Sequence, residues 1–295
     1  MTIGVEREGK IEVPGGRAWY KIVGDGPGVP LLTLHGGPGS GHDYLEPMET
    51  LGNDRPVVFF DQLGCGKSDI PDDLSLYALP RFVEEVDAVR KALHLDEVHL
   101  FGHSWGGFLA IEYMAVSPTG IASLILSSTA PSTRSFEAAA RGLVPGLPDD
   151  VRKTIERCER EGTTDSEEFQ AASMTFLTTH VYRGEQPWPD ALMRSFGNHA
   201  VSPVYAHMWG PSEFSATGNL VGWDREPDIR DVRVPTLITC GRHDEATPDV
   251  GKSMQRAIPG SELVVFENSA HMAMLEESEE YVRVVRDFLW RVEAA

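Results

Sequence analysis

Hydrophobic residues occur along this chain in short runs that alternate with longer stretches of helical periodicity. The short runs predict strands at residues 17–23, 29–34, 55–60, 97–101 and 121–127. Two longer stretches, residues 81–95 and 105–116, have the length and the spacing of apolar positions that indicate helices. Strands that alternate with helices are typical of a mostly parallel sheet covered on both faces, so the pattern predicts an α/β fold.

The alternation is interrupted in the middle of the chain. Between residues 131 and 225 there are helical stretches, prolines and charged residues, but no pattern typical of a buried strand. The alternation returns with a strand at 234–240, a helix at 250–257, a strand at 262–266 and a helix at 278–292. Because neither outer part completes a sheet without the other, we predict one α/β core, residues 1–130 and 226–295. A helical cap, residues 131–225, is inserted into it.

A candidate nucleophile follows the fourth of the predicted strands. The segment FGHSWGGFLA, residues 101–110, contains the pattern G-x-S-x-G around Ser104. This pattern indicates a catalytic serine only where a strand ends just before it and a helix begins just after it, as predicted here. Flanking glycines suit a turn too tight for a nearby Cβ atom. Two interpretations are open at this point: Ser104 is a nucleophile on a strained turn, or it is a small residue in a glycine-rich loop.

A serine hydroxyl needs a general base to take its proton and an acid to orient that base. In a sheet of this type the order along the chain is serine, acid, histidine, each just after a strand. Asp244 follows the strand predicted to end at residue 240, and His271 follows the strand that ends at 266. We therefore predict a triad of Ser104, Asp244 and His271. His243 is an alternative base, although we expect it to point away from the adjoining Asp244, and Asp244 alone could cap the next helix.

Acyl transfer also needs hydrogen-bond donors directed at the negative oxygen of the tetrahedral intermediate. The backbone N–H of Trp105, directly after Ser104, is the expected first donor. The second is expected in the loop after an earlier strand, where the sequence HGGPG occupies residues 35–39. We predict that Gly37 supplies this N–H, and Gly36 is the alternative.

Composition restricts the partners of this protein. The chain has 295 residues and a net charge of −19, which disfavours nucleic acids and anionic membranes because both are polyanions. Its three cysteines form no C-x-x-C pair and predict neither a zinc site nor a disulfide framework. The first residues lack the apolar segment of a signal peptide, and no apolar run is long enough to span a membrane. We expect a cytoplasmic protein without a metal or cofactor, and the sequence leaves its oligomeric state open.

Four short motifs resemble those of one enzyme family. They are HGGPG at 35–39, FDQLGCGKSD at 60–69, GHSWGG at 102–107 and GRHDE at 241–245. Together they are similar to the motifs of the proline iminopeptidases, which are α/β-hydrolase serine peptidases that remove an amino-terminal residue, preferably proline. The resemblance extends over essentially the whole chain and implies the α/β-hydrolase fold.

The resemblance also implies how a substrate is held. In the family, glutamates of the cap and of the core bind the free α-amino group. Glu213, in the cap segment WGPSEF, matches one of them, and Glu245 matches the other. A charged amine that enters a closed pocket loses its hydration, and carboxylates restore the lost stabilisation through charge-assisted hydrogen bonds. We expect Asp61 and Gln62 to support the floor of the site, while Trp105 either contacts the substrate or packs in the core.

The expected function is that of a cytoplasmic serine exopeptidase that forms an acyl-enzyme and releases an amino-terminal residue, preferably proline, from small peptides with a free amino terminus. An amino-acid amidase or prolinamide hydrolase would use the same residues with ammonia as the leaving group, and it is the close alternative. A small-molecule esterase would not need two amine-binding glutamates. Epoxide hydrolases and haloalkane dehalogenases share the fold but attack with a carboxylate, which Ser104 disfavours. A non-catalytic protein of this fold commonly lacks a triad residue, whereas none is missing here.

Overall fold

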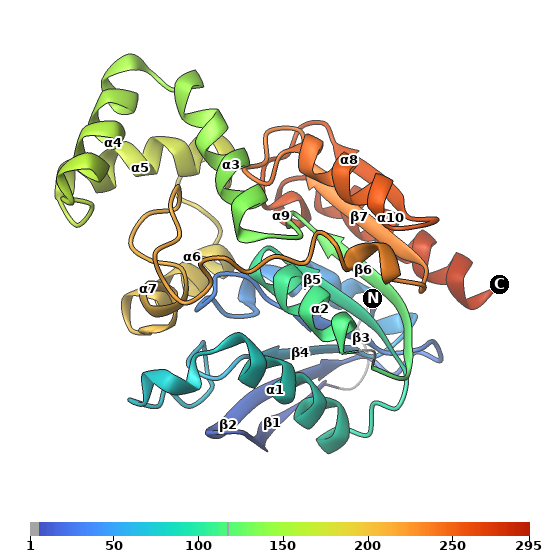
Figure 1. The fold of residues 1–295 in the computed structure, drawn as a ribbon. Coiled ribbons are helices and arrows are strands. Elements are labelled where there is room, and N and C mark those ends of the chain that lie inside the picture. Colours follow the sequence, from blue (N-terminus) through green and yellow to red (C-terminus); the bar gives the residue numbers. More distant parts are fainter. Residues whose placement is uncertain (1–5, 117) are drawn as a thin grey trace.

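The computed structural model describes residues 6–116 and 118–295, and a central β-sheet organises them (Figure 1). In this part of the chain the sheet has eight strands in the order β1-β2-β4-β3-β5-β6-β7-β8. The strands are β1 (Glu6–Val13), β2 (Gly16–Val23), β3 (Leu31–Leu34), β4 (Val57–Asp61), β5 (Val98–His103), β6 (Ile121–Ser127), β7 (Thr236–Gly241) and β8 (Glu262–Phe266). β2 runs antiparallel to β1 and β4, and the other neighbours pair in parallel. The predicted mostly parallel sheet is therefore confirmed.

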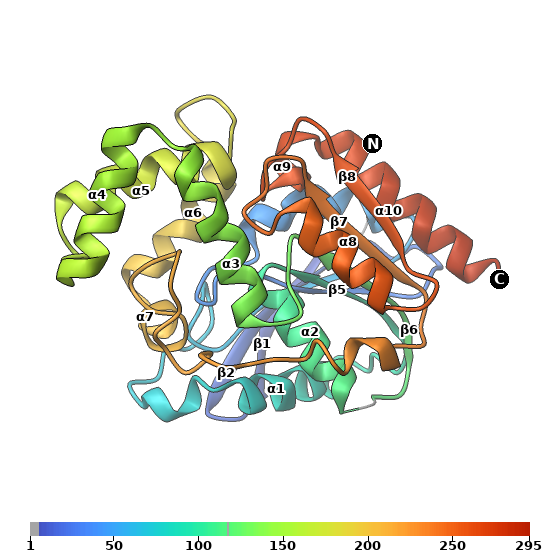
Figure 2. The same ribbon diagram turned by 45° about the horizontal axis from the view of Figure 1, so that its top comes forward.

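Each face of the sheet is covered by its own group of helices (Figures 1 and 2). One group consists of α1 (Leu79–Ala92), α2 (Trp105–Ala115) and α8 (Pro248–Ala257); the other consists of η1 (Asp43–Asn53), α9 (Ala273–Glu276) and α10 (Ser278–Glu293). Successive side chains of a strand point to opposite faces. In β4, Val58 and Phe60 join the apolar cluster of the first group, while Val57 and Phe59 join that of the second. A strand buried on both faces therefore has an unbroken apolar sequence, as β4 does.

Between β6 and β7 the chain forms further helices, which extend from the sheet to one side of the molecule in both views (Figures 1 and 2). They are α3 (Thr133–Leu143), α4 (Asp149–Glu161), α5 (Glu167–His180), α6 (Asp190–Gly197) and α7 (Val204–Met208), with the 3₁₀ segment η4 (Asn198–Ala200) between the last two. α3, α4 and α5 share a small apolar core of their own. Residues 128–235 are all described and contain no strand, only isolated bridges. The division of the chain into a core and an inserted cap of residues 131–225 stays a prediction, and below 'the cap' is only a label for the segment between β6 and β7.

The hydrophobic pattern missed elements that are buried on one side only. β1 is an edge strand whose residues are largely exposed, so it has no apolar run. η1 is a 3₁₀ helix with a proline, Pro47, inside it, and a proline in a helix interior disfavours a helix prediction even though Tyr44, Met48 and Leu51 recur at helical spacing. Some observed bounds also differ from the predicted ones: the helix predicted at 81–95 begins at Leu79 and ends at Ala92.

The junction between β5 and α2 is packed so closely that it requires glycine. A Cβ atom added at Gly102 would lie 2.3 Å from the carbonyl oxygen of Gly106, and one added at Gly106 would lie 2.0 Å from the carbonyl oxygen of Leu34. Real Cβ atoms do not approach backbone atoms this closely. The glycines on both sides of Ser104 are therefore fixed by the packing of α2 against β3 and β5.

We predict that Gly102→Ala lowers the free energy of unfolding by about 1–3 kcal/mol, the usual cost of overpacking, because backbone atoms must move apart. Urea denaturation followed by circular dichroism measures the change. Gly142→Ala is the matched control, since nothing lies within 4 Å of an added Cβ in α3. It should leave stability unchanged or raise it by up to about 1 kcal/mol. Equal stability of the two variants would contradict the account of this junction.

Candidate active site

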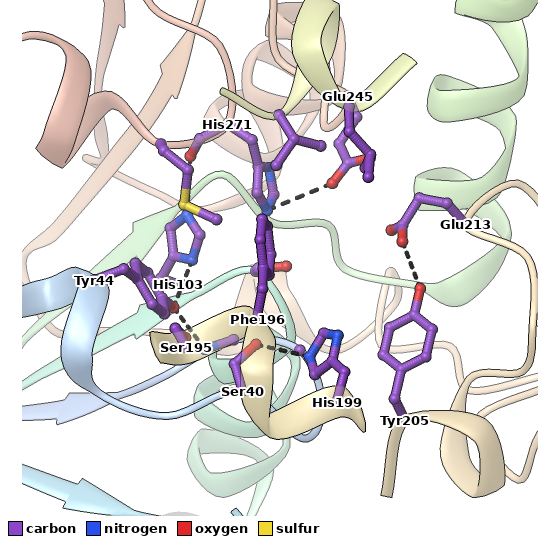
Figure 3. A pocket seen from close by; sticks show the side chains of 16 residues that line it. Ser40, Tyr44, His103, Ser195, Phe196, His199, Tyr205, Glu213, Glu245 and His271 are labelled. Atoms are coloured by element: carbon purple, nitrogen blue, oxygen red, sulfur yellow. Dashed lines mark hydrogen bonds and ion pairs between the residues drawn. The ribbon is translucent and has the colours of Figure 1, made fainter. Parts of the chain in front are cut away.

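Parallel strands bring residues from distant parts of the chain to one edge of the sheet. The carboxyl ends of parallel strands meet at the same edge. Ser104 follows β5, Asp244 follows β7 and His271 follows β8, while Gly37 lies in the loop after β3. Gly37, Ser104 and His271 line one pocket together with residues of the cap (Figure 3). The structure therefore gathers predicted site residues from four strand ends in one place.

Ser104 occupies a strained position between β5 and α2. Its backbone angles are φ 55° and ψ −123°, a region of positive φ that residues with a Cβ atom rarely adopt. Its N–H donates to the carbonyl oxygen of Ser127 over 2.9 Å, and the Thr129 hydroxyl donates to its carbonyl oxygen over 2.8 Å. Such a strand-to-helix turn is the geometry that a nucleophile elbow requires, whereas an ordinary glycine-rich loop has no need of strain at a serine.

Asp244 and His271 form a hydrogen-bonded pair. The Nδ1 atom of His271 lies 2.8 Å from the Oδ1 atom of Asp244, and both side chains are buried. Asp244 also accepts hydrogen bonds from the backbone N–H groups of Gly241 and Ala246, at 3.3 and 2.9 Å. Because an ionised carboxylate only accepts, Nδ1 of His271 carries a hydrogen, and Nε2 of the neutral ring is left as an acceptor.

Ser104 and His271 line the same pocket but are not hydrogen-bonded to each other. Within residues 6–116 and 118–295 the Ser104 hydroxyl makes no hydrogen bond, and Nε2 of His271 lies 3.6 Å from Oε1 of Glu245. In free hydrolases the contact between nucleophile and base is often long and tightens only in the substrate complex. His243, the alternative base, does not line the pocket, and its carbonyl oxygen accepts a hydrogen bond from the ring of His180 over 2.8 Å.

Two backbone N–H groups at the pocket have no acceptor among the residues that the structure describes. Trp105 is the first residue of α2, so its N–H has no partner within the helix. In the described part of the chain the N–H of Gly37 likewise has no acceptor within hydrogen-bonding distance. The N–H of Gly36 donates to the Tyr44 hydroxyl over 2.7 Å and is therefore occupied. The geometry favours Gly37 over Gly36 as the second donor.

Two glutamates face the pocket from different parts of the chain (Figure 3). Glu213, from the cap, accepts a hydrogen bond from the Tyr205 hydroxyl. Glu245, from the loop after β7, is only 3% exposed, and its buried Oε2 atom has no hydrogen-bond partner among the described residues. Burial, together with the charges of Glu213 and Asp244, raises the pKa of Glu245 well above its usual value, and burial also raises the pKa of Glu213. Both carboxylates are therefore held where a cation would stabilise them.

A second, smaller pocket adjoins Ser104 and Glu213, and four of the residues that line it are aromatic. The other residues that line it are Gly37, Pro38, Trp105, Phe108, Phe136, Trp209 and Leu220. The ring of Phe136 packs edge-on against those of Phe108 and Trp209, with centroids 6.0 and 5.4 Å away. Trp105 both lines this pocket and packs in the core, where its indole N–H donates to Oε1 of Gln62 over 2.8 Å. Packing of Trp105 in the core is therefore observed, while its contact with the substrate stays a prediction.

Asp61 and Gln62 contact the loops beneath the pocket and do not line it. The Oδ1 atom of Asp61 accepts hydrogen bonds from the N–H and from the ring of His42, each at 2.8 Å. The side-chain amide of Gln62 donates to the carbonyl oxygen of His35 over 3.0 Å. These contacts agree with the supporting position expected from the sequence.

Several polar and aromatic residues at the site carried no signal in the sequence. Those at the larger pocket are Ser40, Tyr44, His103, Ser195, Phe196, His199 and Tyr205 (Figure 3). The Nε2 atom of His199, in the cap, lies 2.9 Å from the hydroxyl of Ser40, in the loop after β3. Burial lowers the pKa of His199 to about 4, so its ring is uncharged at neutral pH. The members of this group from the cap reach the site only through the packing of the cap on the core, and no spacing in the sequence relates them to the members that lie beside the predicted motifs.

The described part of the chain contains no group of three or more His, Cys, Asp or Glu side chains arranged to hold a metal ion. Nor do these residues include a helix long and apolar enough to cross a membrane. Cys65, Cys158 and Cys240 are free, buried thiols, and none of them lines either pocket.

The chain matches known proteins over most of its length. Residues 29–278 match the α/β-hydrolase fold family. A proline iminopeptidase of Heyndrickxia coagulans is 47% identical over 283 residues, which cover 96% of this chain and 98% of the relative. Among solved structures, VinJ has a TM-score of 0.92 at 36% identity, covering 97% of this chain and 99% of VinJ. A proline iminopeptidase of Mycobacterium smegmatis has a TM-score of 0.90 at 32% identity, covering 98% of this chain and 99% of that chain.

The fold and the family match together define the protein as an α/β hydrolase. Because a relative is 47% identical over nearly the whole length of both chains, this chain belongs, more narrowly, to the proline iminopeptidase family. The resemblance of the four motifs to that family is therefore confirmed.

Replacing Glu213 with glutamine removes a negative charge near Glu245. We expect the pKa of Glu245 to fall toward the usual value of about 4.3, yet to stay above it because the side chain remains buried. Infrared difference spectra recorded during a pH titration would follow the C=O stretch of the protonated carboxyl group. This band should disappear at a lower pH in Glu213→Gln than in the wild type.

The matched control is Glu156→Gln, which removes a half-exposed carboxylate on α4. It should leave the titration of the buried carboxyl band unchanged. If the titrations of Glu213→Gln and of the wild type coincide, the two buried carboxylates do not interact.

Proposed function

We propose that this protein is a serine exopeptidase that releases an amino-terminal residue, preferably proline, from small peptides. The observation that carries the proposal is the presence of Glu213 and Glu245 at the same pocket as Ser104 and His271. An esterase or amidase that acts on neutral substrates has no use for two desolvated carboxylates beside its nucleophile. A peptidase that must recognise a free amino terminus needs a counter-charge there.

The α-ammonium group of the substrate would bind between the two glutamates. Carboxylates held close together in a desolvated site repel each other, and one of them takes up a proton unless a cation is present. The unpartnered Oε2 atom of Glu245 supplies a free acceptor for an N–H of the substrate. Because the glutamates lie next to the nucleophile, only the first residue of a peptide can place its carbonyl carbon at Ser104 while its nitrogen reaches them.

The side chain of that first residue would occupy the small aromatic pocket. This pocket adjoins both Ser104 and Glu213, so a ring bonded to the α-carbon and to the amine nitrogen reaches it directly. The pyrrolidine ring of proline is such a ring, and the faces of Phe136 and Trp209 can bury its methylene groups. This arrangement supports a preference for proline.

The chemistry would follow from the positions of the five remaining site residues. Ser104 Oγ attacks the carbonyl carbon as Nε2 of His271 takes its proton, and Asp244 stabilises the imidazolium. The N–H groups of Gly37 and Trp105 donate to the resulting oxyanion. His271 then gives the proton to the departing peptide nitrogen, which leaves an acyl-enzyme. Water, deprotonated by His271, attacks the acyl-enzyme and releases the free amino acid and Ser104.

Relatives at high identity support peptides as the substrate class, because the matched proteins of Heyndrickxia coagulans and Mycobacterium smegmatis are proline iminopeptidases. Their names do not favour the amidase or the esterase alternative. A free amino terminus as the recognised group and a cytoplasmic location stay proposals that come from the site and from the sequence.

The proposal predicts that Ser104→Ala lowers kcat for a prolyl arylamide by at least about a thousandfold, the effect of removing a triad nucleophile. Release of the coloured arylamine measures the rate. The matched control is Ser128→Ala. Ser128 is also a buried serine with positive φ, and its hydroxyl has no hydrogen-bond partner among the described residues. Its replacement should leave kcat within about threefold of the wild type, because the change breaks no hydrogen bond and leaves the triad in place.

A folded Ser104→Ala variant that retains more than a tenth of the activity would contradict the nucleophile assignment. The same preparation of wild-type enzyme should leave a proline-rich peptide intact when its amino terminus is acetylated. Internal cleavage of that peptide would contradict the exopeptidase assignment.

A further inference from the structure

A chain of three buried hydrogen bonds runs along the wall of the larger pocket and has no part in the proposed chemistry. The N–H of Gly36 lies 2.7 Å from the Tyr44 hydroxyl, which lies 2.9 Å from Nδ1 of His103. The Nε2 atom of His103 lies 2.9 Å from the backbone carbonyl oxygen of His271. Tyr44 and His103 are each only 1% exposed (Figure 3). The chain therefore links the loop after β3 to the loop that carries His271.

The direction of every hydrogen bond in this chain is determined by its two ends. The N–H of Gly36 can only donate, so the Tyr44 hydroxyl accepts there and has its own hydrogen free for His103. The carbonyl oxygen of His271 can only accept, so Nε2 of His103 carries a hydrogen. His103 is thus a neutral ring that accepts at Nδ1 and donates at Nε2. Burial, and then the nearby His271, lowers the pKa of His103 well below its usual value, while burial raises the pKa of Tyr44, so both stay uncharged.

The chain connects the three segments on which the proposed reaction depends. Gly36 adjoins Gly37, the proposed oxyanion donor, and His103 directly precedes Ser104 on the elbow. The backbone of His271 is fixed on both sides, because its carbonyl oxygen accepts from His103 and its N–H donates to His180 over 3.3 Å. Each of these segments follows a different strand, and side-chain hydrogen bonds are what can set their separations to a few tenths of an ångström.

We propose that Tyr44 and His103 are positioning residues, which hold the Gly37 N–H and His271 in register with Ser104 in the transition state. This inference rests on the proposed function, because it takes the roles of Ser104, His271 and Gly37 from it. The Tyr44 hydroxyl also occupies the N–H of Gly36, which leaves Gly37 as the donor that faces the substrate. Loss of that hydroxyl would leave the N–H of Gly36 without an acceptor. The loop after β3 would then lose the hydrogen bond that sets its conformation.

The test compares Tyr44→Phe with the wild type on a prolyl arylamide and on two inhibitors. The first inhibitor is the trifluoromethyl ketone analogue of proline. Ser104 Oγ adds to its carbonyl carbon, the proton passes to His271, and the adduct carries an oxyanion. The second inhibitor is the product, proline, which needs no oxyanion donor. We expect kcat and the affinity for the ketone to fall together by about ten- to a hundredfold, while KM and the affinity for proline stay near wild type.

The matched control is Tyr113→Phe, at the far end of α2. Its buried hydroxyl also accepts one hydrogen bond, from Arg90 over 2.8 Å, and donates one, to Asp87 over 2.5 Å. Removal of this hydroxyl should lower Tm and leave kcat and the affinity for the ketone unchanged. If Tyr44 had a role in packing alone, the two variants would be alike in kcat, in KM and in their affinities for the ketone and for proline. That result would overturn the proposal.

His103→Asn provides a second, independent variant. Its side-chain oxygen can still accept from Tyr44, but no donor reaches the carbonyl oxygen of His271. We expect kcat to fall by about tenfold or more with KM preserved. Wild-type kcat in this variant would overturn the proposal even if Tyr44→Phe failed to fold. If Ser104 is not the nucleophile, the proposed function fails and a different result is expected. Ser104→Ala would then bind the ketone as tightly as the wild type does.

Discussion

The repulsion between two carboxylates in a largely desolvated pocket is the constraint on which the rest of the site depends. Glu245 is almost completely buried, its Oε2 atom is without a partner in the described part of the chain, and Asp244 is its neighbour in sequence. Such a cluster of acids is costly to maintain, and the structure offsets only part of the cost, through the Tyr205 hydroxyl at Glu213. In the proposed function, the amino terminus of a peptide supplies the missing positive charge, so that binding of substrate would relieve this repulsion.

The fold explains how these groups come to be together. A mostly parallel sheet delivers Ser104, Asp244 and His271 to one edge, but it supplies only one of the two glutamates. Glu213 comes from the cap, so the distance between the carboxylates depends on how the cap is seated. Polar contacts between cap and core fix that seating, among them the bond between His199 and Ser40. The overall charge of −19 adds a weak, long-range attraction for cationic substrates.

The sequence predicts those parts of this structure that depend on local pattern. Strands buried on both faces, such as β4 and β6, have largely apolar sequences, and residues directly after such strands could be assigned to the edge of the sheet. β1 escaped prediction because an exposed edge strand needs no apolar run. The choice between Gly36 and Gly37 also stayed open, because it depends on where the Tyr44 hydroxyl lies. Tyr205 and His199 were missed for the same reason: their contacts arise only when the cap folds over the core, and no spacing in the sequence records them.

The most direct test of this account is the ratio of kcat/KM for a prolyl arylamide to kcat/KM for a small neutral ester, measured in the wild type and in Glu213→Gln. A charge-assisted hydrogen bond contributes roughly 1.5–3 kcal/mol, and about 1.4 kcal/mol corresponds to a tenfold change in rate. The account predicts that the variant loses roughly ten- to a hundredfold on the arylamide and far less on the ester, because the ester has no amine for Glu213 to bind. Equal losses on the two substrates would contradict it, since they would mean that Glu213 supports the pocket without recognising the amino terminus.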